Sequence, residues 1–254
     1  MRPRLSRTLS RARWGEYEEL LRTAFGRGYA IVPLEDWVAE GRTSADRVLI
    51  LRHDVDQQPR AALCMAAIEE ELGVSSTWYF RWRTAHPGVV SKLRARGFGV
   101  GLHYETLTRL ARKRGVEAGQ EPDPALVEEA RAVLRKEIEA FASRHGPIRS
   151  VCPHGDSSMP WVSNASLLRD QDAADYGVSF DGNEAMRGAR LAHWLTDRAL
   201  AEGGWKDRVK PTALLADTVS PILCLTHPNN WSSGPSLWTD RVLRSVRPND
   251  EPPL

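Results

Sequence analysis

Cysteine is scarce in this sequence. Its 254 residues include 3 cysteines, and no two of them have the C-x-x-C spacing of a zinc or redox motif. An odd count without such a pair predicts neither a disulfide framework nor a cysteine-ligated metal site. We therefore expect Cys64, Cys152 and Cys224 to be reduced thiols that fill small apolar spaces in the core.

Long apolar runs are absent as well. No stretch approaches the roughly 18 consecutive apolar residues of a membrane span. Arginine occupies positions 2, 4, 7, 11 and 13, and no apolar segment follows these charges. This pattern differs from that of a secretory signal peptide, so we expect a cytoplasmic protein with a solvated N-terminal end and no membrane span.

Neither sign of charge dominates. Lysine and arginine number 35 against 33 acidic residues, which gives a net charge of +2 and no strong case for nucleic acid as a partner. Hydrophobic residues make up 41% and charged residues 27%, as in ordinary globular proteins. The length suits one α/β barrel, so we predict a single domain over residues 1–254. The sequence carries no signal for an oligomeric state.

Short β-like runs alternate with helical runs, which is typical of βα units that build a parallel sheet. We expect strands at residues 48–51, 76–80, 98–104, 148–152 and 221–226, with weaker patterns at 176–180 and 193–196. We expect helices at residues 14–24, 59–72, 88–96 and 124–144, and a short one at 211–217. The core covers about 48–231, after a helical extension at 1–45 and before a loose tail at 248–254.

Histidines and aspartates gather where the expected strands end. Ligands of parallel α/β folds bind beyond the carboxyl ends of the strands. The five clearest strands end in His53-Asp54-Val55-Asp56, Arg81-Trp82-Arg83, His103-Tyr104-Glu105, His154-Gly155-Asp156 and His227-Pro228. Four of these five ends carry a side chain that could bind a metal ion.

Two aspartates follow the first of these strands. In an extended chain Asp54 and Asp56 point the same way, with Cα atoms about 6 to 7 Å apart. Carboxylates that close repel each other unless a cation or a shared proton intervenes. A divalent metal on one would leave the other as a base. His53 would point to the opposite face, where a hydrogen bond that supports the site is expected rather than metal ligation. The alternative is a turn or helix cap before Pro59.

The strand expected at 98–104 places Gly99, Gly101, His103 and Glu105 on one face. Two glycines beside the histidine indicate a crowded interior at this point of the sheet.

The ordered motifs resemble those of the polysaccharide deacetylase family, carbohydrate esterase family 4. They are RHDVD at 52–56, GLHYETL at 101–107, CPHGD at 152–156 and LTHP at 225–228. The resemblance covers about residues 48–231. It implies a distorted α/β barrel of about seven parallel strands, of the (β/α)7 type. It also implies a divalent metal, usually zinc, and hydrolysis of an N-acetyl amide on a sugar.

The resemblance also implies roles for individual residues. Asp54 matches the catalytic base of the family, Asp56 its metal-binding aspartate, and His103 the first histidine of its H-x-x-x-H metal motif. His227 matches the general acid. Asp197, in the segment WLTD, is the candidate for the carboxylate that orients that histidine.

The chain departs from the family at Leu107, where the second histidine of the H-x-x-x-H motif would fall. His154 is our candidate for the third ligand, although it could simply belong to a turn at Gly155. With Asp56 and His103 it would give the three nitrogen and oxygen ligands of an open zinc site. Glu105 or Asp156 could each be a ligand in its place, and His227 could be a fourth ligand instead of the acid.

Three residues are candidates for substrate binding. Arg81 and Arg83 could bind a phosphate or carboxylate, or be a solvated pair of charges. Trp231 lies in a loop-like segment and could stack on a sugar ring, although most tryptophans belong to the core. We therefore predict N-deacetylation of an amino sugar that is small and nucleotide- or lipid-linked. The alternatives are a cyclic amide or imide hydrolase, or a sugar-binding module whose catalytic site has decayed.

Overall fold

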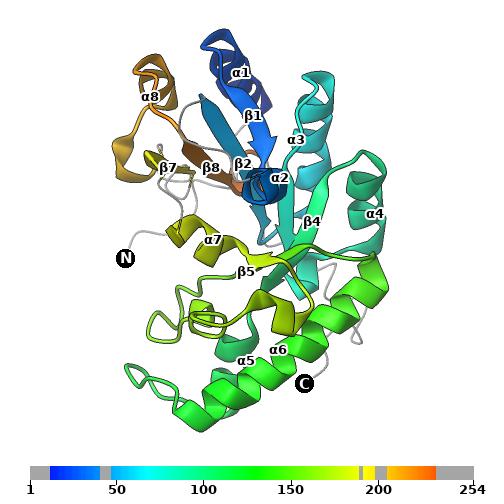
Figure 1. Ribbon diagram of the computed structural model, residues 1–254, viewed down its shortest axis with the longest axis vertical. Coiled ribbons are helices and arrows are strands. Elements are labelled where there is room, and N and C mark those ends of the chain that lie inside the picture. Colours follow the sequence, from blue (N-terminus) through cyan, green and yellow to red (C-terminus); the bar gives the residue numbers. More distant parts are fainter. Residues whose placement is uncertain (1–11, 41–46, 189–190, 198–204, 233–254) are drawn as a thin grey trace.

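A curved parallel sheet forms the centre of the protein (Figure 1). The computed structural model describes residues 12–40, 47–188, 191–197 and 205–232, so the tail expected at 248–254 lies outside the described residues. The strands are β1 (Ala30–Pro33), β2 (Val48–Val55), β3 (Thr77–Phe80), β4 (Gly99–Tyr104), β5 (Ser150–Pro153), β6 (Phe180–Asp181), β7 (His193–Thr196) and β8 (Ile222–Thr226).

Seven of these strands form the barrel wall in the order β6-β5-β4-β3-β2-β8-β7, and every pairing is parallel. Strand β1 pairs with the first half of β2, beside this path. In the described part of the chain no ladder joins β6 to β7, so the wall stays open on that side. The prediction of a distorted α/β barrel of seven parallel strands is therefore confirmed.

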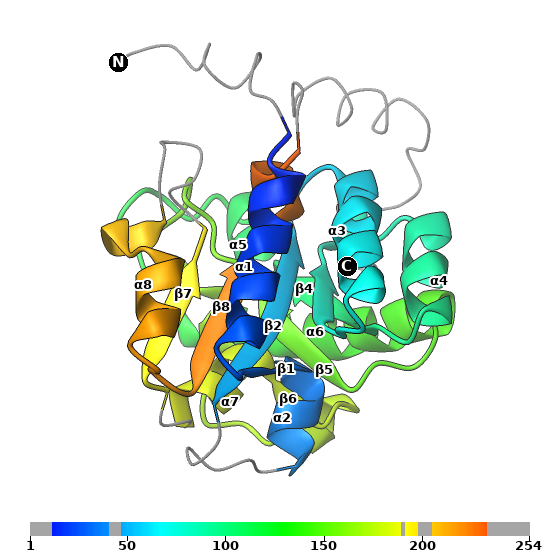
Figure 2. The same ribbon diagram turned by 90° about the horizontal axis from the view of Figure 1, so that it is seen from above.

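Helices surround the sheet. They are α1 (Trp14–Gly26), α2 (Leu34–Glu40), α3 (Pro59–Glu71), α4 (Pro87–Ala95), α5 (Thr106–Lys113), α6 (Pro124–His145), α7 (Gly182–Gly188) and α8 (Pro211–Ala216). Figure 2 shows α8, α1, α3 and α4 side by side around the sheet, and each of these helices contacts the next. Helix α1 is part of the main core, because Tyr17, Leu21 and Ala24 are fully buried there. None of the described helices has the length and apolar character that crossing a bilayer requires.

Strand β2 is buried on both faces. Its outward side chains Leu49 and Leu51 join the main core under the helices, whereas Val48 and Ile50 join a second apolar cluster inside the barrel. The next inward side chains after Ile50 are Arg52 and Asp54. The inward face of β2 is therefore apolar in its first half and charged toward its carboxyl end.

Helix α2 packs at the amino ends of the strands. The backbone N–H of Glu35 donates to Thr77 Oγ1 at 3.2 Å, and Ser150 Oγ donates to Glu35 Oε1 at 2.6 Å. These contacts reach the first residues of β3 and β5. The barrel is thus closed at the end opposite the charged residues.

The crowded interior expected beside His103 is confirmed. A Cβ atom on Gly101 would lie 2.4 Å from the carbonyl oxygen of Ser150 and 2.7 Å from Cε1 of Tyr79. A Cβ atom on Gly99 would lie 2.8 Å from Glu35 Oε2. Only glycine allows β4 to pass this close to its neighbours.

One expected strand is largely wrong. The pattern at 176–180 begins in a 3₁₀ turn, Ala173–Tyr176, and only Phe180–Asp181 pairs with the sheet, as β6. Gly177, with a φ of 75°, ends that turn in the left-handed region and interrupts the run. Helices α5 and α7 were not expected from the sequence, whereas α2 lies within the helical extension expected at 1–45, where the structure also has the strand β1.

Candidate active site

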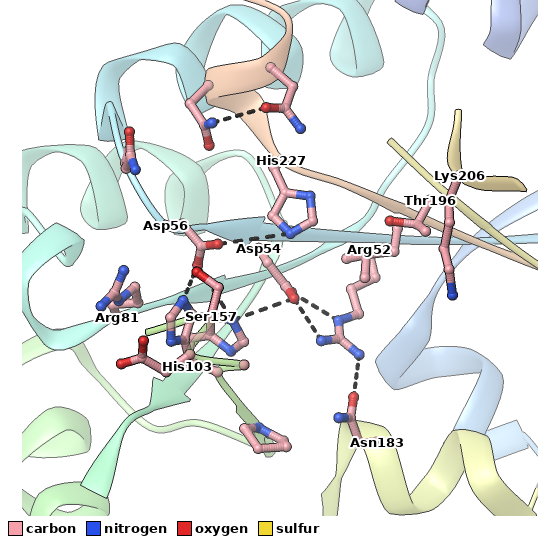
Figure 3. A pocket seen from close by; sticks show the side chains of 18 of the residues that line it. Arg52, Asp54, Asp56, Arg81, His103, Ser157, Asn183, Thr196, Lys206 and His227 are labelled. Carbon is pink, nitrogen blue, oxygen red and sulfur yellow. Dashed lines mark hydrogen bonds and ion pairs between the residues drawn. The ribbon is translucent and has the colours of Figure 1, made fainter. Parts of the chain in front are cut away.

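The carboxyl ends of the strands surround a pocket of about 850 Å³. The predicted base, acid and metal ligands all line this pocket: they are Asp54, Asp56, His103, His154 and His227. Asp197, the predicted orienting carboxylate, does not line it. Figure 3 shows Asp56 between His103 and His227, with Asp54 beside them. The pocket therefore joins residues from β2, β4, β5 and β8.

The three predicted metal ligands meet in this pocket. One donor atom each from Asp56, His103 and His154 lie within 4.8 Å of one another. The Nε2 atoms of both histidines are 3.5 Å from Asp56 Oδ1. That oxygen is buried and has no hydrogen-bond partner among the described residues. A buried carboxylate oxygen left in this way, facing two imidazoles, fits a cation between the three groups.

His103 has the tautomer and the neutral charge that a metal ligand needs. Its Nδ1 atom lies 3.0 Å from the carbonyl oxygen of Cys152, which can only accept, so Nδ1 carries the proton and Nε2 keeps its lone pair. Burial lowers the pKa of His103 to about 4, although the carboxylates of Asp54 and Asp56 act in the opposite direction. The ring is therefore uncharged at neutral pH, as metal binding requires.

Asp56 is half-buried, and its side chain is 23% exposed. Partial burial alone would raise the pKa of Asp56, but the imidazoles of His154, His103 and His227 together hold it well below its ordinary value, so the carboxylate is ionised. The donor set is then one carboxylate and two imidazoles, which suits zinc in an open catalytic site.

The backbone around His154 is fixed on both sides. Its N–H donates to the carbonyl oxygen of Tyr104 at 2.9 Å, and its own carbonyl oxygen accepts from Asn164 Nδ2 at 2.8 Å. By contrast, Leu107 lies in the first turn of α5 and is 1% exposed in the main core. The second imidazole of the cluster comes from the end of β5 instead of from position 107.

Glu105 and Asp156, the two carboxylates that could have replaced His154, are engaged elsewhere. Glu105 forms an ion pair with Arg81 through both of its oxygens. Asp156 pairs with Arg112 and accepts from Ser158. Neither carboxylate belongs to a cluster of potential ligands in the described part of the chain.

A second cluster of potential ligands combines Asp54, His103 and Cys152. Burial raises the pKa of the Cys152 thiol, so this sulfur stays protonated and is a poor ligand. Both oxygens of Asp54 accept from Arg52. The set of Asp56, His103 and His154 is the better metal site.

Arg52 is a site residue that the sequence analysis missed. It is 2% exposed, and its Nε and Nη2 atoms donate to the two oxygens of Asp54 at 2.9 and 2.7 Å. Its Nη1 atom donates to Asn183 Oδ1 at 2.9 Å, and its guanidinium lies over the ring of Tyr79. Although burial opposes ionisation, Arg52 and His103 lower the pKa of Asp54 below its ordinary value. The i, i+2 spacing on β2 could have revealed this pair.

His53 points to the opposite face of β2, as predicted. Its Nδ1 and Nε2 atoms lie 2.6 Å from Thr226 Oγ1 and 2.8 Å from Glu69 Oε1. These contacts join β2 to β8 and α3, so His53 serves the structure and not the pocket.

His227 and Asp197 form the pair expected from the sequence. His227 Nδ1 lies 2.6 Å from Asp197 Oδ1, and the backbone N–H of His227 donates to Oδ2 at 2.7 Å. Burial alone would lower the pKa of His227, but Asp197, Asp56 and Asp54 raise it to about 9. The His227 Nε2 atom is 3.9 Å from Asp56 Oδ2. A protonated imidazole therefore stands next to the candidate metal ligands.

The expectation for Trp231 is wrong. Its side chain is 2% exposed, and its indole N–H donates to Asp197 Oδ2 at 2.7 Å. A ring buried in this way cannot stack on a substrate. Trp194, which is 42% exposed and lines the pocket, offers an aromatic face instead. Because Trp194 lies within a strand, the sequence alone does not show that its side chain is exposed.

Arg81 and Arg83 both line the pocket, together with Lys206. Arg81 is 8% exposed and is bound by Glu105, so part of its charge is already balanced. Binding of substrate by the two arginines stays a prediction.

No model of a known protein family matches this chain, and no curated protein does. Solved structures do match it. A family 4 carbohydrate esterase from Streptomyces lividans, in complex with acetate, matches with a TM-score of 0.41 and 15% identity over 78% of this chain and 85% of that one.

A carbohydrate esterase family 4 pseudoenzyme from Bacillus anthracis matches with a TM-score of 0.43 and 12% identity, over 80% of this chain and 61% of that one. A mutant of the pseudoenzyme with restored enzymatic activity has the same TM-score of 0.43 and 12% identity, with 80% and 63% covered. This chain thus spans less than two thirds of the pseudoenzyme's length.

Proposed function

We propose that this protein is a metal-dependent hydrolase of a carbon–nitrogen amide bond, and that it removes the acetyl group from an N-acetylated amino sugar. One observation carries the proposal: the carboxylate of Asp54 and the imidazole of His227 flank the candidate metal ligands in one pocket. Asp54 Oδ2 is 3.5 Å from His103 Nε2, and His227 Nε2 is 3.9 Å from Asp56 Oδ2.

The residues that would hold the metal are Asp56, His103 and His154. A zinc ion bound there would acidify a water molecule and polarise the carbonyl of the amide. The unpartnered Oδ1 atom of Asp56 and the fixed tautomer of His103 support this assignment.

Asp54 is the proposed base. Arg52 holds both of its oxygens, yet each carboxylate oxygen has a second lone pair with which to accept a proton from the attacking water. The lowered pKa of Asp54 keeps it ionised at neutral pH. A carboxylate with a lowered pKa is a weak base, so it accepts a proton readily only from a water molecule whose own pKa is lowered. A bound metal ion would lower the pKa of that water, which fits a metal-dependent reaction.

His227 is the proposed acid. Asp197 holds its Nδ1 atom, so Nε2 is the proton donor that faces the pocket. With a pKa of about 9 this imidazole is protonated at neutral pH and can give its proton to the leaving amine. Protonation of the nitrogen is needed because an amide anion leaves poorly.

The pocket walls support an amino sugar that carries an anionic group. Trp194 offers an exposed aromatic face for a sugar ring, and Lys206 and Arg83 line the same pocket. A nucleotide- or lipid-linked amino sugar combines a ring, an acetamide and a phosphate in one small molecule.

The test is acetate release by zinc-loaded protein from a panel of N-acetylated amino sugars, both free and phosphate-linked, with cyclic amides and imides in parallel. We expect release from at least one acetamido sugar, and its loss in Asp54→Asn with zinc still bound. Cleavage of ring amides alone would favour a cyclic amide hydrolase. Sugar binding without acetate release would favour a binding module, and either outcome would contradict the proposal.

A further inference from the structure

Trp231 directly follows the 3₁₀ turn Pro228–Asn230, just after His227. Its side chain does not line the pocket, and its indole N–H donates to Asp197. It therefore contacts the carboxylate that holds the proposed acid.

Asp197 is completely buried, and its two oxygens are shared between two residues. Oδ1 pairs with His227 Nδ1 at 2.6 Å, whereas Oδ2 accepts the backbone N–H of His227 and the indole N–H of Trp231, both at 2.7 Å. A carboxylate removed from water needs such donors to satisfy its oxygen lone pairs. The Trp231 N–H is the one side-chain donor to Oδ2 in the described part of the chain.

The indole of Trp231 is itself held in place. Its ring meets the edges of Tyr17 and Trp205, with centroids 5.4 and 5.8 Å away. The carbonyl oxygen of Trp231 accepts from the backbone N–H of Arg13 at 2.8 Å. Packing against the N-terminal helix α1 thus fixes the direction in which the N–H points.

We propose that Trp231 is a positioning residue for proton transfer. Its N–H fixes the Asp197 carboxylate, which in turn keeps the proton of His227 on Nδ1 and directs Nε2 into the pocket. The inference rests on the proposed function in one respect, since it takes His227 to be the acid. Trp231 itself touches neither the substrate nor the metal ligands.

Trp231→Phe removes the N–H and keeps a ring in the same space. If the hydrogen bond matters, kcat falls about tenfold or more, as expected for a lost hydrogen bond to a charged group, while KM and zinc content hold. Trp205→Phe is the matched control, because Trp205 packs on Trp231 without a hydrogen bond to Asp197 among the described residues. We expect it to keep kcat.

A double-mutant cycle separates this role from simple packing. In an Asp197→Asn background Trp231→Phe should cost little further activity, because the group through which it acts is already changed. Equal, additive losses in both backgrounds would overturn the inference, and so would an equal loss from Trp205→Phe.

A second measurement does not depend on activity. The Nδ1–H proton of His227, bonded to Asp197, should give a strongly downfield NMR signal that weakens or shifts in Trp231→Phe and persists in Trp205→Phe. That result in a protein without acetate release would leave the positioning role standing while the proposed function fails. If Trp231→Phe does not fold, benzothienylalanine at position 231 replaces the N–H by sulfur in a ring of equal size. If the variant that lacks the N–H at position 231 has an unchanged signal and an unchanged kcat, the proposal is overturned.

Discussion

Arg52 and Asp54 lie two residues apart on β2, and the guanidinium of Arg52 donates to both oxygens of Asp54, at 2.9 and 2.7 Å. Both side chains are buried, so the charge of each one is stabilised by the charge of the other. The pair fixes the direction in which the proposed base accepts a proton. It also explains why a base in this interior remains ionised.

Arg52→Lys tests this relationship. Lysine keeps the charge but cannot form the two parallel hydrogen bonds, so we expect kcat to fall about 100-fold while zinc binding is retained. Steady-state kinetics and metal content measure the two effects. Wild-type kcat in the variant would show that the orientation of Asp54 does not limit the reaction.

His154→Ala tests the third metal ligand. Removing one of three ligands should weaken zinc binding by at least about 100-fold, measured by competition with a chelator. Asp156→Asn is the control: this carboxylate also stands at the end of β5 but pairs with Arg112, so zinc affinity should hold. Normal zinc binding by His154→Ala would refute the ligand assignment.

Asp197→Asn should change the pH dependence of kcat. Burial lowers the pKa of His227, and Asp197 together with Asp56 and Asp54 raises it to about 9, so the acid is protonated below that pH and loses its proton as the pH rises through it. Without the charge of Asp197 the pKa of His227 falls, and the alkaline limb of the kcat profile moves to lower pH. An alkaline limb that stays in place would mean that another group, and not His227, sets it.

Lys206→Ala should distinguish substrates. Lys206 lines the pocket, and no carboxylate partner is seen for it among the described residues. If it binds an anionic group, the variant raises KM for phosphate-linked amino sugars several-fold and leaves KM for neutral ones unchanged. Equal effects on both classes would argue against an anionic substrate.

Gly101→Ala should destabilise the fold. The added Cβ atom would meet the backbone oxygen of Ser150, which cannot move away cheaply, so we expect a loss of about 1–3 kcal/mol in the free energy of unfolding. Gly15→Ala is the control, since nothing lies within 4 Å of its Cβ position in α1. Denaturant titration compares the two variants, and equal stability of both would contradict the account of the crowded interior.

Much of the fold could be predicted because its signals are local. Alternating strands and helices indicate a parallel sheet, and the carboxyl ends of such strands meet at one edge. That geometry predicts that Asp56, His103 and His154 come together, as they do in the structure. The packing of α2 against the amino ends of the strands, through Glu35, depends on residues distant in the sequence and could not be predicted locally.

The errors share a physical cause, which is that packing partners are distant in the sequence. Trp231 looks exposed in its loop, yet α1 covers it from more than 200 positions away. The ion pair between Arg81 and Glu105 also joins residues that follow two different strands, and the sequence did not predict it. Local patterns report which residue types stand at a strand end, but tertiary contacts decide which of them reach the pocket.

We propose that one metal ion, held by Asp56, His103 and His154, makes this pocket hydrolytic. The most direct measurement is the rate of acetate release from the best acetamido sugar as zinc is added to metal-free protein. The rate should rise from near zero and level off at one equivalent of zinc, and Asp54→Asn should stay inactive throughout. Metal-free protein as active as loaded protein, or fully loaded protein that releases no acetate, would contradict the claim.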